Sequence, residues 1–290
     1  MIKRFRQRLL VLRRMVVLRT RGRVRHTDRF GLSYWIWDHS RALATRAGQP
    51  RTDDTGVLEQ LRNAYRVIEG SSDKTAGKLV SFDVGAYIGV ISLAMSRFGF
   101  SNHVVHSFEA DDLNFDHLKQ NVAGGSSPGI SIHNIAVADL SGTAEFTRNI
   151  DHGTNHLGSA AEAGDSPVVV YEVPVTSLDD FVEANGIDTI DVLKIDVEGA
   201  DLNVLRGAEG LLGNERIKVL IVEIPMTVEQ RSEMIDLLSA HGYSTAYIVR
   251  NTTKLAEPTE TTYSGSERAP LNMISVRPDL ADPMGVAFTK

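Results

Sequence analysis

The chain has 290 residues and no cysteine, which excludes disulfide bonds, thiolate metal ligands and a cysteine nucleophile. Residues 1–30 hold eleven basic side chains against one acid, a net charge of +10, whereas the whole chain carries −6. Residues 31–290 therefore carry −16, which argues against a large nucleic-acid footprint on the main body. With no run of about 18 apolar residues, we expect a cytoplasmic protein, with peripheral membrane contact as an option.

The first 25 residues predict a basic amphipathic helix. Its apolar stripe has helical spacing and consists of Ile2, Phe5, Leu9, Leu12 and Val16. Such a helix suits an anionic partner, and the cytoplasmic face of a membrane is the expected one. Packing of the stripe on the protein's own acidic body is the alternative that the sequence leaves open. Residues 48–56 are polar and are predicted to be a linker, so residues 1–56 form an extension and residues 57–290 the main domain.

From residue 78 onward, short apolar runs alternate with helical patterns. The seven runs are residues 79–84, 103–108, 130–136, 191–195, 219–224, 243–249 and 271–276. Alternation of this kind predicts an α/β fold with a mostly parallel seven-stranded sheet and helices on both faces. The last two runs have no helix between them and predict an antiparallel pair at one sheet edge. Residues 140–175, rich in Gly, Ser, Asn, His and Asp, are predicted to be a lid or binding loop.

A glycine turn follows the first predicted strand and is the first candidate for cofactor binding. It contains Asp83, Gly85, Ala86 and Gly89. Glycines let a ligand approach the backbone, and the next helix offers free N–H groups. The carboxylate of Asp83 can accept hydrogen bonds from an ammonium group but repels a pyrophosphate. This favours S-adenosylmethionine over NAD; tight packing of strand on helix is the alternative.

Two more acids follow the next strands. Glu109 comes about 20 residues after the glycine turn, where an acid can accept hydrogen bonds from both ribose hydroxyls of an adenosine. Asp139 follows the third strand, where an adenine amino group could be met; a surface turn is the alternative for this residue.

Charged and apolar residues alternate at the end of the fourth strand. Period 2 places Lys194, Asp196 and Glu198 on one side, and the carboxyl ends of such strands line the ligand crevice. Lys194 suits a structural ion pair. Asp196 is the first candidate for a catalytic base, and with Glu223 it could also bind Mg²⁺ through oxygen ligands. His152 and His156, in a polar loop, are second candidates for the base.

Six segments together resemble the FkbM-type methyltransferase family. They are VSFDVGAYIG, HSFEADDLNFDHLKQNV, NIAVAD, VTSLDDF, DVLKIDVEGADLNVLRGAE and VLIVEI, between about residues 78 and 225. The resemblance implies a class I fold that uses S-adenosylmethionine and a hydroxyl acceptor on a polyketide, sugar or related compound. It implies that Asp83, Gly85 and Gly89 contact the methionine part of the cofactor and Glu109 its ribose. The chain departs from the family pattern at Tyr87 (usually Asn), Ala110 (usually Pro) and Asp201 (usually Glu).

The sequence therefore predicts an S-adenosylmethionine-dependent O-methyltransferase. Its acceptor would be a small molecule, a glycan, a lipid-linked sugar or a secondary metabolite, with Asp196 and His156 as catalytic residues. Two alternatives remain. An NAD(P)-dependent oxidoreductase leaves Asp83 and the KIDVEG segment unexplained, and a non-catalytic membrane-associated adaptor leaves Asp83, Glu109 and Asp196 without a use.

Overall fold

The computed structural model describes residues 23–27, 31–37, 54–71, 78–99, 102–124, 129–149, 155–158, 168–225, 227–249, 252, 254–259 and 270–286. Most of the predicted basic helix and of the linker lies outside these residues, as does His152. Residues 23–25, which the prediction places in that helix, belong instead to a β-strand. Among the described residues, no helix has the length and apolar character needed to cross a bilayer.

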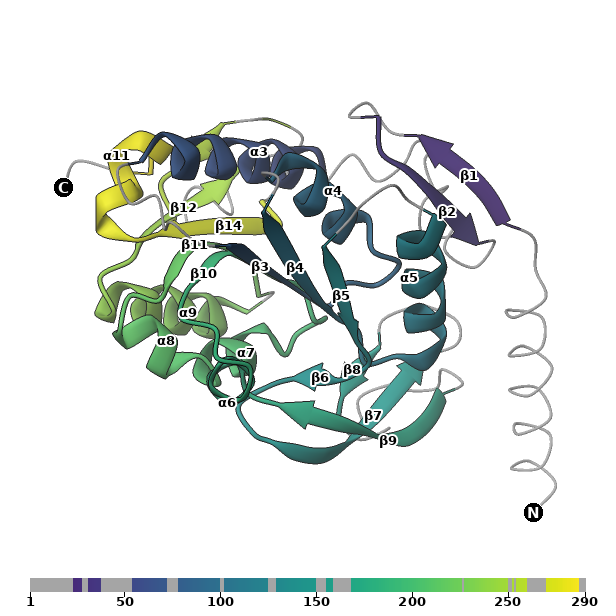
Figure 1. The fold of residues 1–290 in the computed structure, drawn as a ribbon. Helices are drawn as coiled ribbons and strands as arrows, with labels where there is room; N and C mark the ends of the chain where they lie inside the picture. Colours follow the sequence, from purple (N-terminus) through teal and green to yellow (C-terminus); the bar gives the residue numbers. More distant parts are fainter. Residues whose placement is uncertain are drawn as a thin grey trace, which may run out of the picture.

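A twisted eight-stranded sheet forms the centre of the fold (Figure 1). Its strands are β3 (Leu79–Val84), β4 (His103–Phe108), β5 (Ile130–His133), β10 (Ile190–Ile195), β11 (Ile217–Glu223), β12 (Ser244–Ile248), β13 (Leu255–Ala256) and β14 (Asn272–Val276). Their order is β13-β12-β14-β11-β10-β3-β4-β5. The five strands from β11 to β5 pair in parallel. The chain leaves β3 toward β4 on one side and later returns to β10 on the other, which creates a topological switch point.

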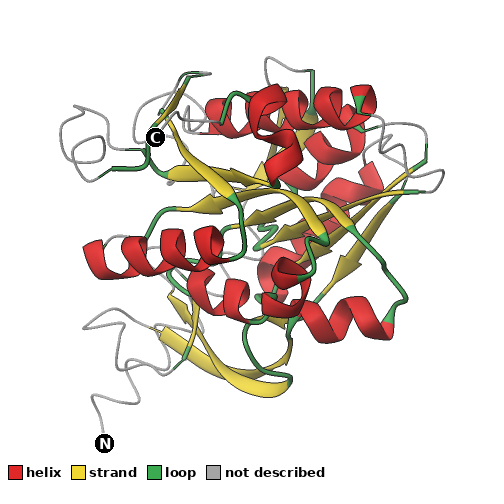
Figure 2. Cartoon of the chain, turned by 90° about the vertical axis from the view of Figure 1, so that its left-hand side faces the viewer, coloured by secondary structure: helices red, strands yellow, loops and turns green. Residues whose placement is uncertain are grey.

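Two hydrophobic cores lie on opposite faces of this sheet, because successive strand residues point to opposite sides. Val192 faces one core and Leu193 the other. The first core is covered by α3 (Asp54–Gly70), α4 (Val90–Phe98) and α11 (Ala281–Met284), preceded by the 3₁₀ turn η2 (Pro278–Leu280). The second is covered by α6 (Leu178–Ala184), α7 (Asp201–Arg206), α8 (Glu209–Gly213) and α9 (Val228–Ala240). Figure 2 shows helices on both sides of the strands.

Two helices of the second face, α6 and α9, begin at side-chain caps. The Ser177 side chain accepts a hydrogen bond from the Asp180 N–H at the start of α6, and Thr227 does the same for Gln230 at the start of α9. Each such cap satisfies a backbone donor that would otherwise lack a partner and contributes about 1 kcal/mol. The remaining helix, α5 (Asp112–Gly124), contacts β5.

The sheet differs from the prediction at its carboxyl-terminal end. The expected antiparallel pair is present, but β14 lies between β11 and β12 and pairs with both, so it is not an edge strand. The edge is β13, a short eighth strand antiparallel to β12. The partners of β14 are distant from it in sequence, and such pairing leaves no local sequence pattern. The apolar runs alone therefore do not predict the order of β11, β14 and β12 in the sheet.

The predicted lid between residues 140 and 175 instead contains strands. A second sheet of four strands, in the order β6-β9-β7-β8, lies beside the carboxyl ends of β4 and β5 (Figure 1). Its strands are β6 (Ala136–Val137), β7 (Gly142–Asn149), β8 (His156–Leu157) and β9 (Val168–Thr176). The predicted strand 130–136 therefore divides between the two sheets.

A hairpin precedes the main domain. It consists of β1 (Arg23–Thr27) and β2 (Ser33–Trp37). The main-chain N–H of Trp35 donates to the Asn121 side chain on α5, and Leu32 and Tyr34 are buried in the first core. Part of the predicted extension thus packs on the domain, while a domain boundary at residue 56 stays a prediction.

Candidate active site

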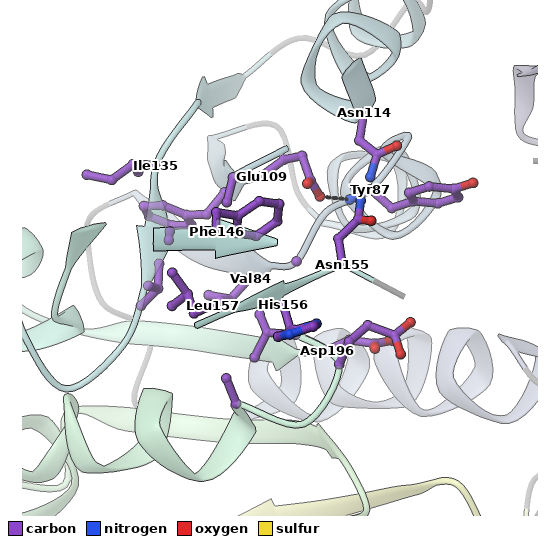
Figure 3. Close-up of a pocket in the computed structure, with 18 residues that line it drawn as sticks. Val84, Tyr87, Glu109, Asn114, Ile135, Phe146, Asn155, His156, Leu157 and Asp196 are labelled. Carbon is purple, nitrogen blue, oxygen red and sulfur yellow. Dashed lines mark hydrogen bonds between the residues drawn. The ribbon is translucent and has the colours of Figure 1, made fainter. Parts of the chain in front are cut away.

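A pocket opens at the switch point, beyond the carboxyl ends of β3, β4 and β10 (Figure 3). Its lining consists of Val84, Gly85, Tyr87, Phe108, Glu109, Ala110, Asn114, Ile135, Ala136, Val137, Phe146, Asn155, His156, Leu157, Asp196, Val197, Glu198 and Ala200. Four of the predicted site residues are among them: Gly85, Glu109, His156 and Asp196. Asp83, Ala86, Gly89, Asp139 and Glu223 are not.

Gly85 allows two loops to meet at the pocket floor. Its φ is +80°, and a β-carbon at this position would lie 1.8 Å from the carbonyl oxygen of Asp196. The Asp196 N–H donates to the Val84 carbonyl at 3.0 Å, which continues the pairing of β10 with β3 into the loop. Only glycine fits this close backbone approach without a clash.

The other two members of the predicted glycine turn pack the turn itself. Ala86 is buried, and its N–H donates to the Phe108 carbonyl at 2.8 Å. A β-carbon on Gly89 would lie 2.5 Å from Cδ1 of Leu118, so this glycine lets α4 and α5 pack closely. The structure therefore favours the packing interpretation for these two residues.

Asp83 lies below the pocket and is 2% exposed. Its carboxylate accepts a hydrogen bond from the Ser92 hydroxyl, which in turn accepts one from Ser107. Burial raises the pKa of Asp83 to about 6, although Ser92 and Lys194 favour its ionised form. Asp83 is not among the pocket-lining residues, and its contact with a ligand ammonium stays a prediction.

Glu109 occupies the polar side of the pocket. Its Oε2 accepts from the Tyr87 N–H at 2.8 Å (Figure 3), and its Oε1 accepts from the Asp111 N–H at 2.9 Å. Burial and the neighbouring Asp111 carboxylate raise the pKa of Glu109 to about 8. The Asn114 side chain is a further hydrogen-bond partner that favours the ionised form. Because a carboxylate has about four lone-pair sites, Glu109 can still accept a hydrogen bond from a ligand hydroxyl.

Tyr87 has a φ of +52°, in the left-handed region that is costly for most side chains. Asparagine, which the family usually has here, adopts this region more easily. Ala110, a second departure, also lines the pocket. Asp201, the third, accepts hydrogen bonds from the N–H groups of Val197 and Gly199 and thereby holds the loop after β10. Burial raises its pKa to about 6.

Asp196 is held by a lysine from the same strand. Lys194 is 3% exposed, and its Nζ lies 3.1 Å from Asp196 Oδ2. Burial alone would lower the pKa of Lys194, but the carboxylates of Asp196, Asp83 and Asp201 outweigh it and raise the pKa. Lys194 therefore stays charged and fixes the carboxylate of Asp196, a pocket-lining residue whose side chain is 46% exposed. The structural ion pair expected for Lys194 is present.

Glu223 and Asp139 lie outside the pocket lining. Burial, followed by the charges of Asp196, Asp201 and Glu198, raises the pKa of Glu223 to about 9. Among the described residues, no three or more His, Asp or Glu side chains form a metal-binding group, so a site made by Asp196 and Glu223 stays a prediction. Asp139 is exposed after β6 and favours the surface-turn interpretation.

Sequence reasoning missed the apolar wall and the residues from the second sheet. Ile135, Phe146 and Leu157 form an apolar side opposite the polar groups, and Asn155 comes from the segment before β8 (Figure 3). Period-2 alternation in residues 142–149 would have been the signal for β7. It is hidden because Thr147, Arg148 and Asn149 are buried although they are polar.

A mostly parallel sheet with β14 inserted antiparallel and a pocket at the switch point is the arrangement expected of the class I methyltransferase fold. The model of the methyltransferase FkbM domain matches residues 83–245, more than half of the chain. The chain belongs to this family, which favours methyl transfer over the oxidoreductase alternative.

The individual proteins that the chain resembles have low sequence identity to it. The chain is 28% identical, over 191 residues, to the 31-O-demethyl-FK506 methyltransferase FkbM of Streptomyces tacrolimicus, covering 57% of this chain and 72% of that protein. A crystal structure of methyltransferase FkbM from Methylobacillus flagellatus matches with a TM-score of 0.44 and 14% identity, over 81% of this chain and 57% of that one. The METTL16 MTase domain matches with a TM-score of 0.48 and 11% identity, over 87% of this chain and 86% of that one.

Proposed function

We propose that the protein transfers a methyl group from S-adenosylmethionine to an oxygen of a small molecule, glycan or lipid-linked sugar. The observation that carries this proposal is Glu109: a buried carboxylate whose oxygens are oriented by two backbone N–H groups at the carboxyl end of β4. That arrangement suits the two neighbouring hydroxyls of a ribose.

The remaining pocket fits the other parts of this cofactor. Ile135, Phe146 and Leu157 offer an apolar surface for an adenine ring, and Gly85 lines the same pocket without a side chain. The cofactor supplies a sulfonium-bound methyl group. The residues of this chain supply position, and proximity with alignment accounts for about 7–11 kcal/mol of barrier in favourable model systems.

An alcohol acceptor must lose its proton as the carbon–oxygen bond forms and the carbon–sulfur bond breaks. Asp196 is our candidate for the base, because its carboxylate lines the pocket and is oriented by Lys194. His156 lines the same pocket from β8 and is the second candidate. The name of the Streptomyces relative refers to an O-demethyl substrate, which supports an oxygen acceptor here.

Mg²⁺ bound through Asp196 and Glu223, and contact of residues 1–25 with an anionic membrane, remain proposals. Unchanged activity after exhaustive chelation would contradict the proposal of a bound metal.

The membrane contact is tested by flotation with anionic liposomes at low salt, which compares the full chain with a chain lacking residues 1–25. Equal flotation of the two would contradict the membrane contact, whose motive is the +10 charge of residues 1–30.

The test of the proposed function has two stages. Calorimetry with S-adenosylhomocysteine against NAD first measures cofactor preference, and we expect micromolar binding of the former only. Incubation with S-adenosylmethionine and extracted glycans and lipids then identifies products that gain the mass of one methyl group. Absence of S-adenosylhomocysteine binding by the native chain would overturn the proposal.

A further inference from the structure

A buried arginine links the second sheet to the loop that carries Glu109. Arg148 on β7 is 4% exposed, and its guanidinium forms ion pairs with Asp111 and Asp112 at the start of α5. Its Nη2 also donates to the Tyr171 hydroxyl of β9 at 2.8 Å. Two strands of the second sheet are thus joined to one end of α5.

Asn155 joins the same network from the pocket side. Its Nδ2 donates to Asp111 Oδ2 at 3.2 Å, and its Oδ1 accepts from the Asn149 N–H at 3.1 Å. Asn155 and the adjacent His156 line the pocket. The position of both residues therefore depends on where Asp111 holds the segment before β8.

Asp111 is also coupled to Glu109. The Asp111 N–H donates to Glu109 Oε1, while Asp111 Oδ1 accepts from the Asn114 N–H in the first turn of α5. Asp111 is fully buried and receives bonds from Arg148, Tyr171 and Asn155. Asp111 consequently connects the proposed ribose-binding acid, through its main-chain N–H, with three groups from β7, β9 and the segment before β8, through its carboxylate.

A buried ion pair is weak evidence for stability, because the cost of desolvating two charges can exceed their attraction. Such a pair is better explained where it fixes geometry. The chain offers a comparison: Lys218 and Asp191 form another buried ion pair, at 2.9 Å, near the amino ends of β11 and β10 and outside the pocket lining. Of these two ion pairs, the one made by Arg148 contacts groups of the pocket and the one made by Lys218 lies outside the pocket lining.

We propose that Arg148 is a positioning residue for cofactor binding: through Asp111 it holds the second sheet against the Glu109 loop, which sets Glu109 on one side of the pocket and Asn155 with His156 on the other. This inference rests on the proposed function, since it concerns the same pocket. Arg148 does not line the pocket itself and acts through these neighbours.

The experiment measures S-adenosylhomocysteine affinity by calorimetry and the midpoint temperature of unfolding by thermal denaturation. Each calorimetric titration is run well below the midpoint temperature of that variant, so that the folded protein is measured. Arg148→Lys keeps the charge but loses the planar fork that reaches two carboxylates. We expect it to weaken binding about tenfold, in the range for groups that share one network, and Arg148→Met to weaken it more. The matched control is Lys218→Met, which should lower the midpoint but leave affinity within about twofold of native.

Asn155→Ala keeps the ion pair and tests the proposal if an Arg148 variant fails to fold. We expect a midpoint close to native and an affinity lowered about fivefold, since two hydrogen bonds are lost, one of them to a charged group. Native affinity in Asn155→Ala and in the folded Arg148 variants would overturn the inference, as would an equal loss in Lys218→Met. The proposed function would survive these results, because it fails only when the native chain itself does not bind.

Discussion

Gly85 and Asp196 approach each other so closely that the α-carbon of one faces the main-chain carbonyl of the other with no room for a methyl group. This contact joins the loop after β3 to the loop after β10 and forms the floor of the pocket. The carboxylate of Asp196 can point into the pocket because its own backbone is fixed by Val84 and Gly85.

The first prediction concerns this contact. Gly85→Ala should abolish S-adenosylhomocysteine binding, because the β-carbon forces the two loops apart, and it should lower the free energy of unfolding by more than the conformational cost of a positive φ, about 1–2 kcal/mol. Gly186→Ala is the control: Gly186 has a φ of +61° but open space around its α-carbon. Equal effects of the two changes in calorimetry and thermal denaturation would show that the contact has no special role.

The second prediction separates Glu109 from Asp139, both of which the sequence offered as cofactor ligands. Glu109→Gln should weaken S-adenosylhomocysteine binding by about 2–3 kcal/mol, since it removes a charged acceptor from a desolvated contact. Asp139→Asn should leave affinity unchanged, because Asp139 is exposed outside the pocket. Calorimetry on both variants checks this, and a larger loss for Asp139 would restore its predicted contact with adenine.

The third prediction is a pH dependence of cofactor affinity. With a pKa of about 8, Glu109 is mainly protonated near pH 7 in the ligand-free protein. Ribose hydroxyls donate to the ionised form and lower this pKa, so binding releases protons below pH 8 and affinity rises as the pH increases from about 6 to about 8. Calorimetry in buffers of different ionisation enthalpy measures the released protons. The dependence should disappear in Glu109→Gln; an affinity that falls over this pH range would contradict the assignment.

The fourth prediction concerns the base. Asp196→Asn should lower the single-turnover rate by at least about a hundredfold while keeping S-adenosylhomocysteine affinity, the effect of losing a positioned base. His156→Gln is measured in parallel, with the acceptor found by methyl gain. If affinity fell in Asp196→Asn while the rate held, Asp196 would be a binding residue; a large rate loss in His156→Gln alone would transfer the role to the histidine.

Much of the central sheet could be predicted, because buried parallel strands are continuous apolar runs and the helices between them have clear periodicity. The strand Leu79–Val84 has the predicted bounds. The antiparallel position of β14 could not be predicted, since its partners lie far away in sequence.

The candidate site was predictable where the residues follow strand ends, as Glu109 and Asp196 do. It was not predictable where polar residues are buried by pairing with one another. Arg148 and Asp111 look like ordinary surface charges until the fold brings β7 to the start of α5. For Asp83 the sequence motif correctly predicted the position of the turn, but the side chain is buried and is not among the residues that line the pocket.

The insertion of β14 between β11 and β12 has a consequence for biosynthesis. As the chain emerges from the ribosome, both neighbours are made before residues 272–276, so β11 has no partner on that side until β14 arrives. This half of the sheet is completed only late in translation, and its apolar edge needs protection from intermolecular pairing until then.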